Sequence, residues 1–232
     1  MIHLKGYGLH LRHNLFMMER KNGGKIMREK IVVFGGNGFF GQRFVRLASE
    51  QGFQVISVSR RGAPQPTEAW HRAVEWVKGD VFSPEDWRLL FENATAVVDC
   101  IGIIHQNPST NQTYQRFNVE IARILVTEAR KQQVPIFVYL SAKPFVPFLL
   151  KAYFESKKRA EAIIMDVYPN PLIIRPSLFV GKERRGTRAV AQLTKFAHAL
   201  GLLKKFQPQP VETAARMVLD EMIQKMKTKE VG

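Results

Sequence analysis

The sequence predicts an α/β domain in which a doubly wound parallel sheet is covered by helices on both faces and followed by a reduced C-terminal helical portion. Short runs of β-branched and apolar residues alternate with helical stretches along the chain, and no internal repeat interrupts them. Parallel strands need crossover connections, which place helices on both faces of the sheet. With 232 residues, 45% of them hydrophobic, the chain can form one substantial core.

The first strand, the turn after it and the first helix form the most informative segment. We expect the strand at Ile31–Gly35 and the helix at Phe39–Gln51. The turn residues are Gly35, Gly36, Asn37, Gly38, Phe39, Phe40 and Gly41. Glycines at these spacings allow a tight turn, a close approach of phosphate and close packing of helix on strand. A strand, turn and helix in this order wrap backbone N–H groups around a dinucleotide pyrophosphate. All seven residues are therefore candidate cofactor contacts, and the alternative is a turn that binds nothing.

The remaining strands follow from short apolar segments bounded by turn residues. They are expected at Gln54–Ser59, Glu75–Lys78, Ala96–Cys100, Ile136–Ser141 and Pro171–Arg175. Together with the first strand they predict a six-stranded sheet. Because helical segments separate most of them, the sheet should be parallel, which is the arrangement of a Rossmann domain.

The remaining helices follow from apolar periodicity and from start signals. Ser83 and Pro84 resemble an N-cap followed by proline at the first helical position, so a helix is expected from there to Phe91. The other helices are expected at Tyr114–Gln133, Tyr153–Val167, Ala189–Leu200 and Val211–Lys227. The last two would form the C-terminal portion.

Residues after the second and third strands concern the adenosine end of a dinucleotide. An acidic residue at the end of the second strand would accept hydrogen bonds from a ribose 2′-hydroxyl and favour NAD. This chain has Ser59, Arg60 and Arg61 there. Guanidinium groups suit a 2′-phosphate, so NADP(H) is favoured over NAD(H). The alternative places these arginines on a solvated turn. Asp80, after the third strand, is a candidate for the adenine amino group or for a simple turn cap.

A second group of residues has the composition of a proton-transfer site. Tyr153 and Lys157 lie four residues apart on a predicted helix and therefore share one face. A nearby cation stabilises a phenolate, which lowers the pKa of tyrosine. Ser141 ends the fifth strand at the edge where open parallel sheets bind ligands, and it could orient a substrate oxygen. Gly102, after the fourth strand, is a further candidate cofactor contact at this edge.

These motifs resemble the atypical branch of the short-chain dehydrogenase/reductase superfamily. The glycine turn resembles its nucleotide-binding signature, and later segments are similar to its landmarks at residues 138–142, 153–161 and 174–181. Residues 117–119 and 209–215 are similar to its helix-borne asparagine segment and to its late docking segment. The resemblance covers about residues 29–220 and implies that Ser141, Tyr153 and Lys157 form a catalytic triad, with Lys157 also contacting the cofactor.

Two mitochondrial groups of that branch are similar to this chain. One is the dehydrogenase-like accessory subunit of respiratory complex I, and the other is a protein of the coenzyme Q biosynthetic complex. The first resemblance implies a tightly held, structural nucleotide, and the second implies assembly or a redox step. Only 57 residues, 176–232, follow the sixth strand, so the usual substrate-binding portion is trimmed.

Net charge and the N-terminal segment suggest a location. The chain carries 35 basic and 20 acidic residues, a formal charge of +15. Residues 1–28 form a basic, acid-poor leader that resembles a mitochondrial presequence, and the Rossmann domain is expected at 29–232. A second basic stretch between residues 182 and 205 could bind an anionic lipid surface or an acidic protein partner. Nucleic acid is not favoured, because no aromatic and basic stacking platform accompanies the charge.

Several site types are excluded or disfavoured. The single cysteine, Cys100, cannot form an internal disulfide and is expected as a buried core residue. The six histidines show no metal-ligand spacing, so no metal is expected, and His105 is interpreted as a loop residue. No apolar run reaches the roughly 18 residues that a membrane-spanning helix needs.

The segment between Ser141 and Tyr153 contains two prolines and four large apolar residues at positions 145–150. Such a loop fits an isoprenoid or quinone ring, a lipid surface or a protein partner, unless it simply fills the core.

Three hypotheses follow from these observations. The chain is an NAD(P)H-binding accessory or assembly component of a respiratory or ubiquinone-biosynthetic membrane complex on the matrix side of the mitochondrial inner membrane. Alternatively, it is an active NADPH-dependent oxidoreductase acting on a hydrophobic carbonyl or quinone-like substrate, or a nucleotide-responsive redox sensor.

Overall fold

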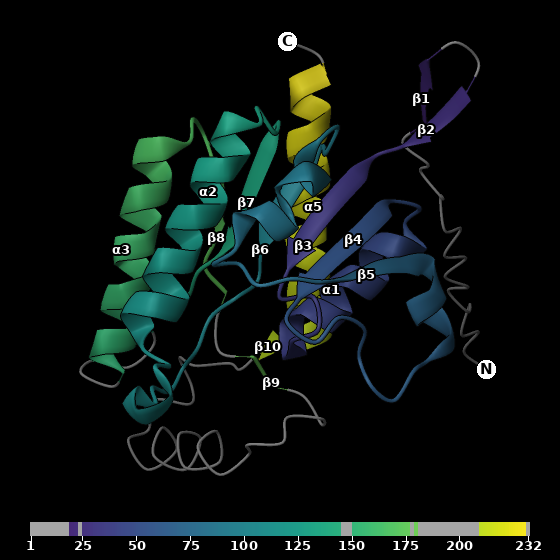
Figure 1. The fold of residues 1–232 in the computed structure, drawn as a ribbon. Coiled ribbons are helices and arrows are strands. Elements are labelled where there is room, and N and C mark those ends of the chain that lie inside the picture. The colour runs from purple at the N-terminus through teal and green to yellow at the C-terminus, as the bar shows by residue number, and fades with distance from the viewer. Residues whose placement is uncertain (1–18, 23–24, 145–149, 177–178, 181–208, 231–232) are drawn as a thin grey trace, which may run out of the picture.

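A computed structural model describes residues 19–22, 25–144, 150–176, 179–180 and 209–230 (Figure 1). Its centre is a six-stranded sheet in the order β5-β4-β3-β6-β7-β8, and every neighbouring pair is parallel. The strands are β3 Lys30–Phe34, β4 Gln54–Ser59, β5 Val74–Lys78, β6 Ala96–Asp99, β7 Ile136–Leu140 and β8 Leu172–Ile174. The doubly wound parallel sheet is confirmed, and each predicted strand lies within one or two residues of its observed bounds.

Helices cover both faces of the sheet (Figure 1). Helices α1 (Phe39–Glu50) and α5 (Val211–Glu230) pack on one face, and α2 (Ile121–Lys131) and α3 (Lys151–Val167) pack on the other. The last four residues of β3 are all apolar because they face two cores: Ile31 and Val33 point into the first core, while Val32 and Phe34 point into the second. A central parallel strand is buried on both sides, so alternation between polar and apolar residues disappears.

Strand order reverses at β3, since β4 lies on one side of it and β6 on the other. In an open α/β sheet, this reversal leaves a crevice outside the carboxyl ends of the strands. The turn after β3, the end of β6 and the end of β7 all meet there. The fold therefore brings together segments that are about 65 and 105 residues apart in the chain.

The helix predicted from Ser83 to Phe91 is wrong. Two 3₁₀ turns occupy this region, η2 at Pro84–Asp86 and η3 at Arg88–Phe91. Trp87 lies between them with φ −140° and is 1% exposed. Its indole packs edge-on against Phe34 at 4.9 Å between ring centroids and donates to the Asp80 carbonyl at 2.9 Å. Burying this side chain stabilises the second core more than one extra helical turn would.

The predicted helix at Tyr114–Gln133 exists but is not uniform. It begins with a π-helical segment, η5 (Gln115–Glu120), which continues into α2. The cause lies at Asn118, whose side-chain oxygen accepts from the Ile103 N–H at 2.9 Å and whose amide donates to the Ile103 carbonyl at 3.2 Å. These bonds draw one turn of the helix toward the segment after β6, and π turns accommodate such distortions.

Short elements outside the sheet complete the described structure. A hairpin of β1 (Glu19–Asn22) and β2 (Lys25–Arg28) lies within the predicted basic leader. Two 3₁₀ turns, η1 (Ala69–Ala73) and η4 (Pro108–Thr110), were not predicted, and β9 (Phe179–Val180) pairs in parallel with β10 (Gln209–Pro210). The predicted helix at 189–200, the basic stretch at 182–205, the first 18 residues and the apolar loop positions 145–149 lie outside the described residues. No helix in the described ranges is long and apolar enough to cross a bilayer.

Candidate functional site

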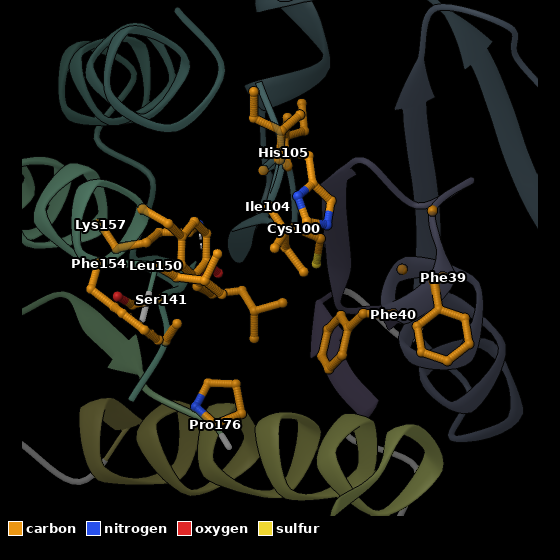
Figure 2. Close-up of a pocket in the computed structure, with 18 of the residues that line it drawn as sticks. Phe39, Phe40, Cys100, Ile104, His105, Ser141, Leu150, Phe154, Lys157 and Pro176 are labelled. Atoms are coloured by element: carbon orange, nitrogen blue, oxygen red, sulfur yellow. Dashed lines mark hydrogen bonds between the residues drawn. The ribbon is translucent and has the colours of Figure 1, made fainter. Parts of the chain in front are cut away.

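A cavity of about 380 Å³ opens at the carboxyl edge of the sheet (Figure 2). Its walls come from the start of α1, the segments after β6 and β7, and the first turns of α3. Figure 2 shows Ser141 and Lys157 on one side, Phe40 on the opposite side, and His105 above Cys100 and Ile104. The cavity therefore occupies the crevice that the reversal of strand order creates.

The glycine turn forms one wall of this cavity. Gly35 has φ +82°, a conformation that residues with a side chain rarely adopt. At Gly41 a Cβ atom would stand 2.2 Å from the Gly35 carbonyl oxygen and 2.7 Å from the Gly36 Cα, so only glycine lets α1 pack this closely on the turn. These contacts show why the glycine pattern is needed for the packing of the turn itself.

The N-terminus of α1 fits a pyrophosphate. Gly38 is the N-cap residue, no described side chain caps this end of the helix, and Gly38, Phe39, Phe40 and Gly41 all line the cavity. A Cβ on Gly38 would meet only the Gly35 carbonyl oxygen, at 3.0 Å, so the space above it is open. An uncapped helix N-terminus presents backbone N–H groups and a positive dipole end to an anion.

Asn37 and Ser59 join the two turns at this edge. The Asn37 amide donates to the Gly62 carbonyl at 3.1 Å, and the Ser59 hydroxyl donates to the same oxygen at 2.9 Å. Both side chains are thus used in holding the turn after β4 against the glycine turn. Neither residue lines the cavity, and both position these turns.

The other predicted adenosine contacts also lie outside the cavity lining. Arg60 and Arg61 are exposed on the turn after β4. The guanidinium carbon of Arg60 lies 5.6 Å from the centroid of the Phe117 ring. Asp80 is exposed, and its carboxylate accepts from the Phe82 N–H at 3.1 Å. In the structure Asp80 therefore acts as a turn cap, the simpler of the two roles considered for it.

The three predicted catalytic residues, Ser141, Tyr153 and Lys157, all line the cavity. The Lys157 ammonium is buried, donates to the Leu140 carbonyl at 2.9 Å and lies 4.6 Å from the centroid of the Tyr139 ring. A Cβ on Gly102 would stand 3.0 Å from Lys157 Nζ, so glycine at this position leaves room for the ammonium. Burial lowers the pKa of Lys157 to about 8, against the raising effect of the Asp99 carboxylate.

Ser141 is held by a partner that sequence reasoning missed. Its hydroxyl donates to the buried carboxylate of Glu161, which lies one turn after Lys157 on α3. Arg175, from the segment after β8, holds Glu161 through Nε at 2.9 Å and Nη2 at 2.7 Å. Because the hydroxyl hydrogen is directed to Glu161, the Ser141 oxygen presents lone pairs to the cavity. The spacing of four residues between Lys157 and Glu161 was the available signal, because it places both side chains on one face of the helix.

Asp99 is the second residue that was missed. It ends β6, is 1% exposed, and accepts from the Ile101 N–H at 2.9 Å. Its other oxygen has no hydrogen-bond donor among the described residues. Burial raises the pKa of Asp99 to about 6, opposed by the Lys157 charge. An acidic residue at the end of an apolar strand was the signal in the sequence.

Cys100 was predicted as a buried core residue, and this is wrong in part. It is half-buried and lines the cavity beside the glycine turn. Burial, with the Asp99 charge, raises the pKa of its thiol well above the ordinary value, so the sulfur stays protonated.

His105 lies in the loop after β6 and lines the same cavity. Among the described residues, no three acidic, cysteine or histidine side chains are grouped as metal ligands would be.

The comparisons with known proteins define the class. Residues 31–197 match the model of the NAD dependent epimerase/dehydratase family, so the chain belongs to that family. The chain also superposes on the solved structure of Bordetella bronchiseptica WbmH in complex with NAD⁺, with a TM-score of 0.62 and 17% sequence identity. The superposition covers 84% of this chain and 72% of that one. The resemblance to NAD(P)-dependent short-chain dehydrogenases drawn from the motifs is confirmed.

Three proteins in this comparison are similar to the chain in sequence. The chloroplastic protein At1g32220 of Arabidopsis thaliana is 36% identical over 163 residues, which are 68% of this chain and 53% of that protein. MIOREX complex component 2 of Saccharomyces cerevisiae is 31% identical over 68% of this chain and 75% of that protein. The mitochondrial NADH-ubiquinone oxidoreductase 40 kDa subunit of Neurospora crassa is 22% identical over 76% and 48%. The chain thus spans about half the length of the first and third relatives.

Proposed function

We propose that this chain binds a nicotinamide dinucleotide at the cavity and serves as an accessory or assembly component of a mitochondrial membrane complex. The observation that carries the first part is the uncapped N-terminus of α1, which faces the cavity through Gly38 and Gly41. Backbone N–H groups there would hold the pyrophosphate. Lys157 and Tyr153 would hold the nicotinamide ribose, and a bound nucleotide would supply or accept a hydride there.

We propose NADP(H) as the preferred nucleotide. Arg60 and Arg61 stand after β4, where an acidic residue would select the 2′-hydroxyl of NAD. The Ser59 and Asn37 bonds to Gly62 hold this turn beside the glycine turn, which supports a role for both arginines at the adenosine end of a bound dinucleotide. A guanidinium binds phosphate through two N–H groups and does not lose its charge.

The proposed location and assembly rest on the relatives and on the character of the chain. Two relatives carry names that place them in assemblies: MIOREX complex component 2, and the 40 kDa subunit of NADH-ubiquinone oxidoreductase, whose name also gives a mitochondrial location. The cavity walls include Ile101, Ile103, Leu140 and Phe154, which suit an apolar neighbour more than a sugar. We place the chain on the matrix side of the inner membrane, with complex subunits and an anionic lipid surface as partners.

Mass spectrometry tests the nucleotide. The full chain is purified natively, denatured, and the released small molecules are identified and counted. We expect about one NADP(H) per chain with no turnover required for its retention. The proposal fails if no nucleotide is released and neither NADPH nor NADH binds to the purified chain.

Native electrophoresis of isolated mitochondria tests the assembly. A tagged full chain is expected to migrate with an inner-membrane complex, and a Gly41→Ala variant, in which the turn cannot pack, should not. Migration only as a monomer, or a chain found outside mitochondria, contradicts the assembly role and leaves the nucleotide proposal standing.

An active oxidoreductase is the second candidate, favoured by the convergence of Ser141, Tyr153 and Lys157 on one cavity. Tyr153 would give its proton to a carbonyl oxygen while a bound NADPH supplied a hydride to the carbonyl carbon, and Lys157 would stabilise the phenolate that remains. The Ser141 oxygen would accept a hydrogen bond from the hydroxyl group so formed. A steady-state assay with NADPH and panels of quinones and aldehydes checks this. Turnover lost in Tyr153→Phe supports catalysis, and full turnover in that variant excludes the phenol as the acid.

A further inference from the structure

Two arginines and two phenylalanines form one continuous row beside the nucleotide site, which we call the arginine–aromatic row (Arg60, Phe82, Arg116 and Phe117). Arg60 lies over Phe117 at 5.6 Å, and Phe117 meets Phe82 edge-on at 6.4 Å between centroids. The guanidinium carbon of Arg116 lies 3.9 Å from the centroid of Phe82. The row joins the turn after β4, the segment after β5 and the start of the helix that follows β6.

The charge of this row is not balanced. Among the residues that the structure describes, no carboxylate lies within 4.0 Å of Arg60 or Arg116. The nearby acid, Asp80, is turned to the Phe82 N–H. By contrast Arg46 on α1 pairs with Glu50, and Arg123, two turns after Arg116, binds Glu120. Two uncompensated cations close to one ring pair favour an anionic ligand.

The geometry also leaves the binding groups of Arg116 free. A guanidinium stacked by its face on a ring keeps its N–H donors at the edge, directed sideways. Phe82 therefore restricts the position of Arg116, which is half-buried, without using its hydrogen bonds. Such a restrained fork loses little entropy when it binds a phosphate.

We propose that the arginine–aromatic row binds the 2′-phosphorylated adenosine end of the dinucleotide, and that Arg116 is a second residue, besides Arg60, that selects NADP(H) over NAD(H). The inference rests on the proposed nucleotide binding. The adenosine half of a dinucleotide lies over the carboxyl ends of the strands on the β4 and β5 side of the glycine turn. An adenine ring stacks on aromatic or guanidinium faces, and the phosphate pairs with guanidinium edges.

Titration calorimetry on the full chain tests this inference with NADPH, NADH, 2′,5′-ADP and 5′-AMP as probes. We expect Arg116→Gln to raise the Kd for NADPH and 2′,5′-ADP about 10- to 100-fold, as for the loss of a charge-assisted hydrogen bond. The Kd for NADH and 5′-AMP should change less than about threefold. Arg123→Gln removes a paired arginine from the same helical segment and should leave all four constants unchanged.

The outcomes separate the two levels of the proposal. Equal losses for NADPH and NADH, or no loss for either, overturn the role of Arg116 while nucleotide binding stands. Failure of the wild-type chain to bind any dinucleotide overturns the proposed function as well. Arg116→Lys keeps the charge but not the fork, so it should retain part of the NADPH preference. The midpoint of thermal unfolding without ligand shows whether each variant is folded.

Discussion

Lys157 and Asp99 are both buried, and the charge of each changes the ionisation of the other. Burial disfavours both charges, while their mutual attraction favours them. Lys157 is fixed by the Leu140 carbonyl, whereas one oxygen of Asp99 has no donor from any described residue.

The Asp99 carboxyl predicts a pH dependence of stability. Because its pKa in the folded chain is raised to about 6, the folded state holds more protons than the unfolded state between about pH 4 and pH 6. The free energy of unfolding should therefore fall across this window as pH rises, by about 1–3 kcal/mol. Urea unfolding should show this fall in the wild-type chain and not in Asp99→Asn. An equal slope in both would show that Asp99 is not the titrating group.

The glycines of the turn predict two different consequences of adding one methyl group. In Gly41→Ala the new carbon meets backbone atoms of Gly35 and Gly36, so the free energy of unfolding should drop by about 2–4 kcal/mol. In Gly38→Ala it meets only one carbonyl oxygen and faces the cavity, so the chain should fold but bind dinucleotide more weakly. Denaturation and calorimetry check both. A stable Gly41→Ala chain would contradict the close packing.

At the scale of elements, the irregular start of the helix after β6 depends on one side chain. Asn118 bonds both backbone groups of Ile103 and donates to Ser156 Oγ at 2.9 Å, in the buried contact of η5 with α3. The π-helical segment thus carries Arg116 and Phe117 to their contacts with Phe82 and Arg60. Its geometry follows from the tertiary contact rather than from helix propensity.

Asn118→Ala should cost about 2–4 kcal/mol of the free energy of unfolding, because it removes the buried Asn118 side chain that bonds both backbone groups of Ile103 and donates to Ser156 Oγ. Gln115→Ala, at an exposed position in the same segment, should change it by less than about 0.5 kcal/mol. Urea denaturation measures both. Similar small effects in the two variants would mean that the Asn118 bonds contribute little to stability.

At the scale of the whole molecule, α5 closes the fold. It returns from the far end of the chain to pack beside α1, and residues such as Val218 and Met222 are buried in the first core (Figure 1). Without it, one face of the sheet would expose a large apolar area. The packing of α5 therefore completes this core.

A chain ending at residue 208 should therefore lose cooperative unfolding and bind a hydrophobic dye, whereas a chain ending at residue 230 should behave as the full chain. Denaturation followed by near-UV circular dichroism and by dye fluorescence provides the two measurements. A cooperative transition in the shorter chain would show that α5 is not required to cover the sheet.

The distribution of charge also belongs to the whole molecule. Residues 1–28 carry a net charge of +5 and residues 181–208 carry +6, while residues 209–232 are neutral. The sheet and its covering helices are therefore close to balanced, and most of the basic excess lies in two segments of the sequence. Salt-dependent binding to acidic partners or lipid head groups should depend on these segments.

Local sequence was sufficient for the strands, most helices and the cavity wall at the glycine turn. Apolar runs, turn residues and the spacing of Tyr153 and Lys157 depend on neighbours within a few positions, so these features are visible along the chain. The two 3₁₀ turns found in place of the helix expected at Ser83–Phe91 could not be predicted in this way, because they depend on the packing of Trp87 on Phe34, a residue more than 50 positions away. Likewise, the groups that hold Ser141 and Arg116 lie 20 to 34 positions from them.

The sequence alone was enough to predict the order of strands and helices, the glycine turn and the candidate catalytic residues. Apolar periodicity and glycine spacing are local properties, so they can be read along the chain. Only the tertiary structure decided that Ser141 donates its hydrogen bond to Glu161, that Asp99 is buried and interacts with Lys157, and that Arg116 joins Arg60 in one row. Burial and pairing arise between segments distant in the chain, and these determine the charge and hydrogen-bonding capacity of each side chain.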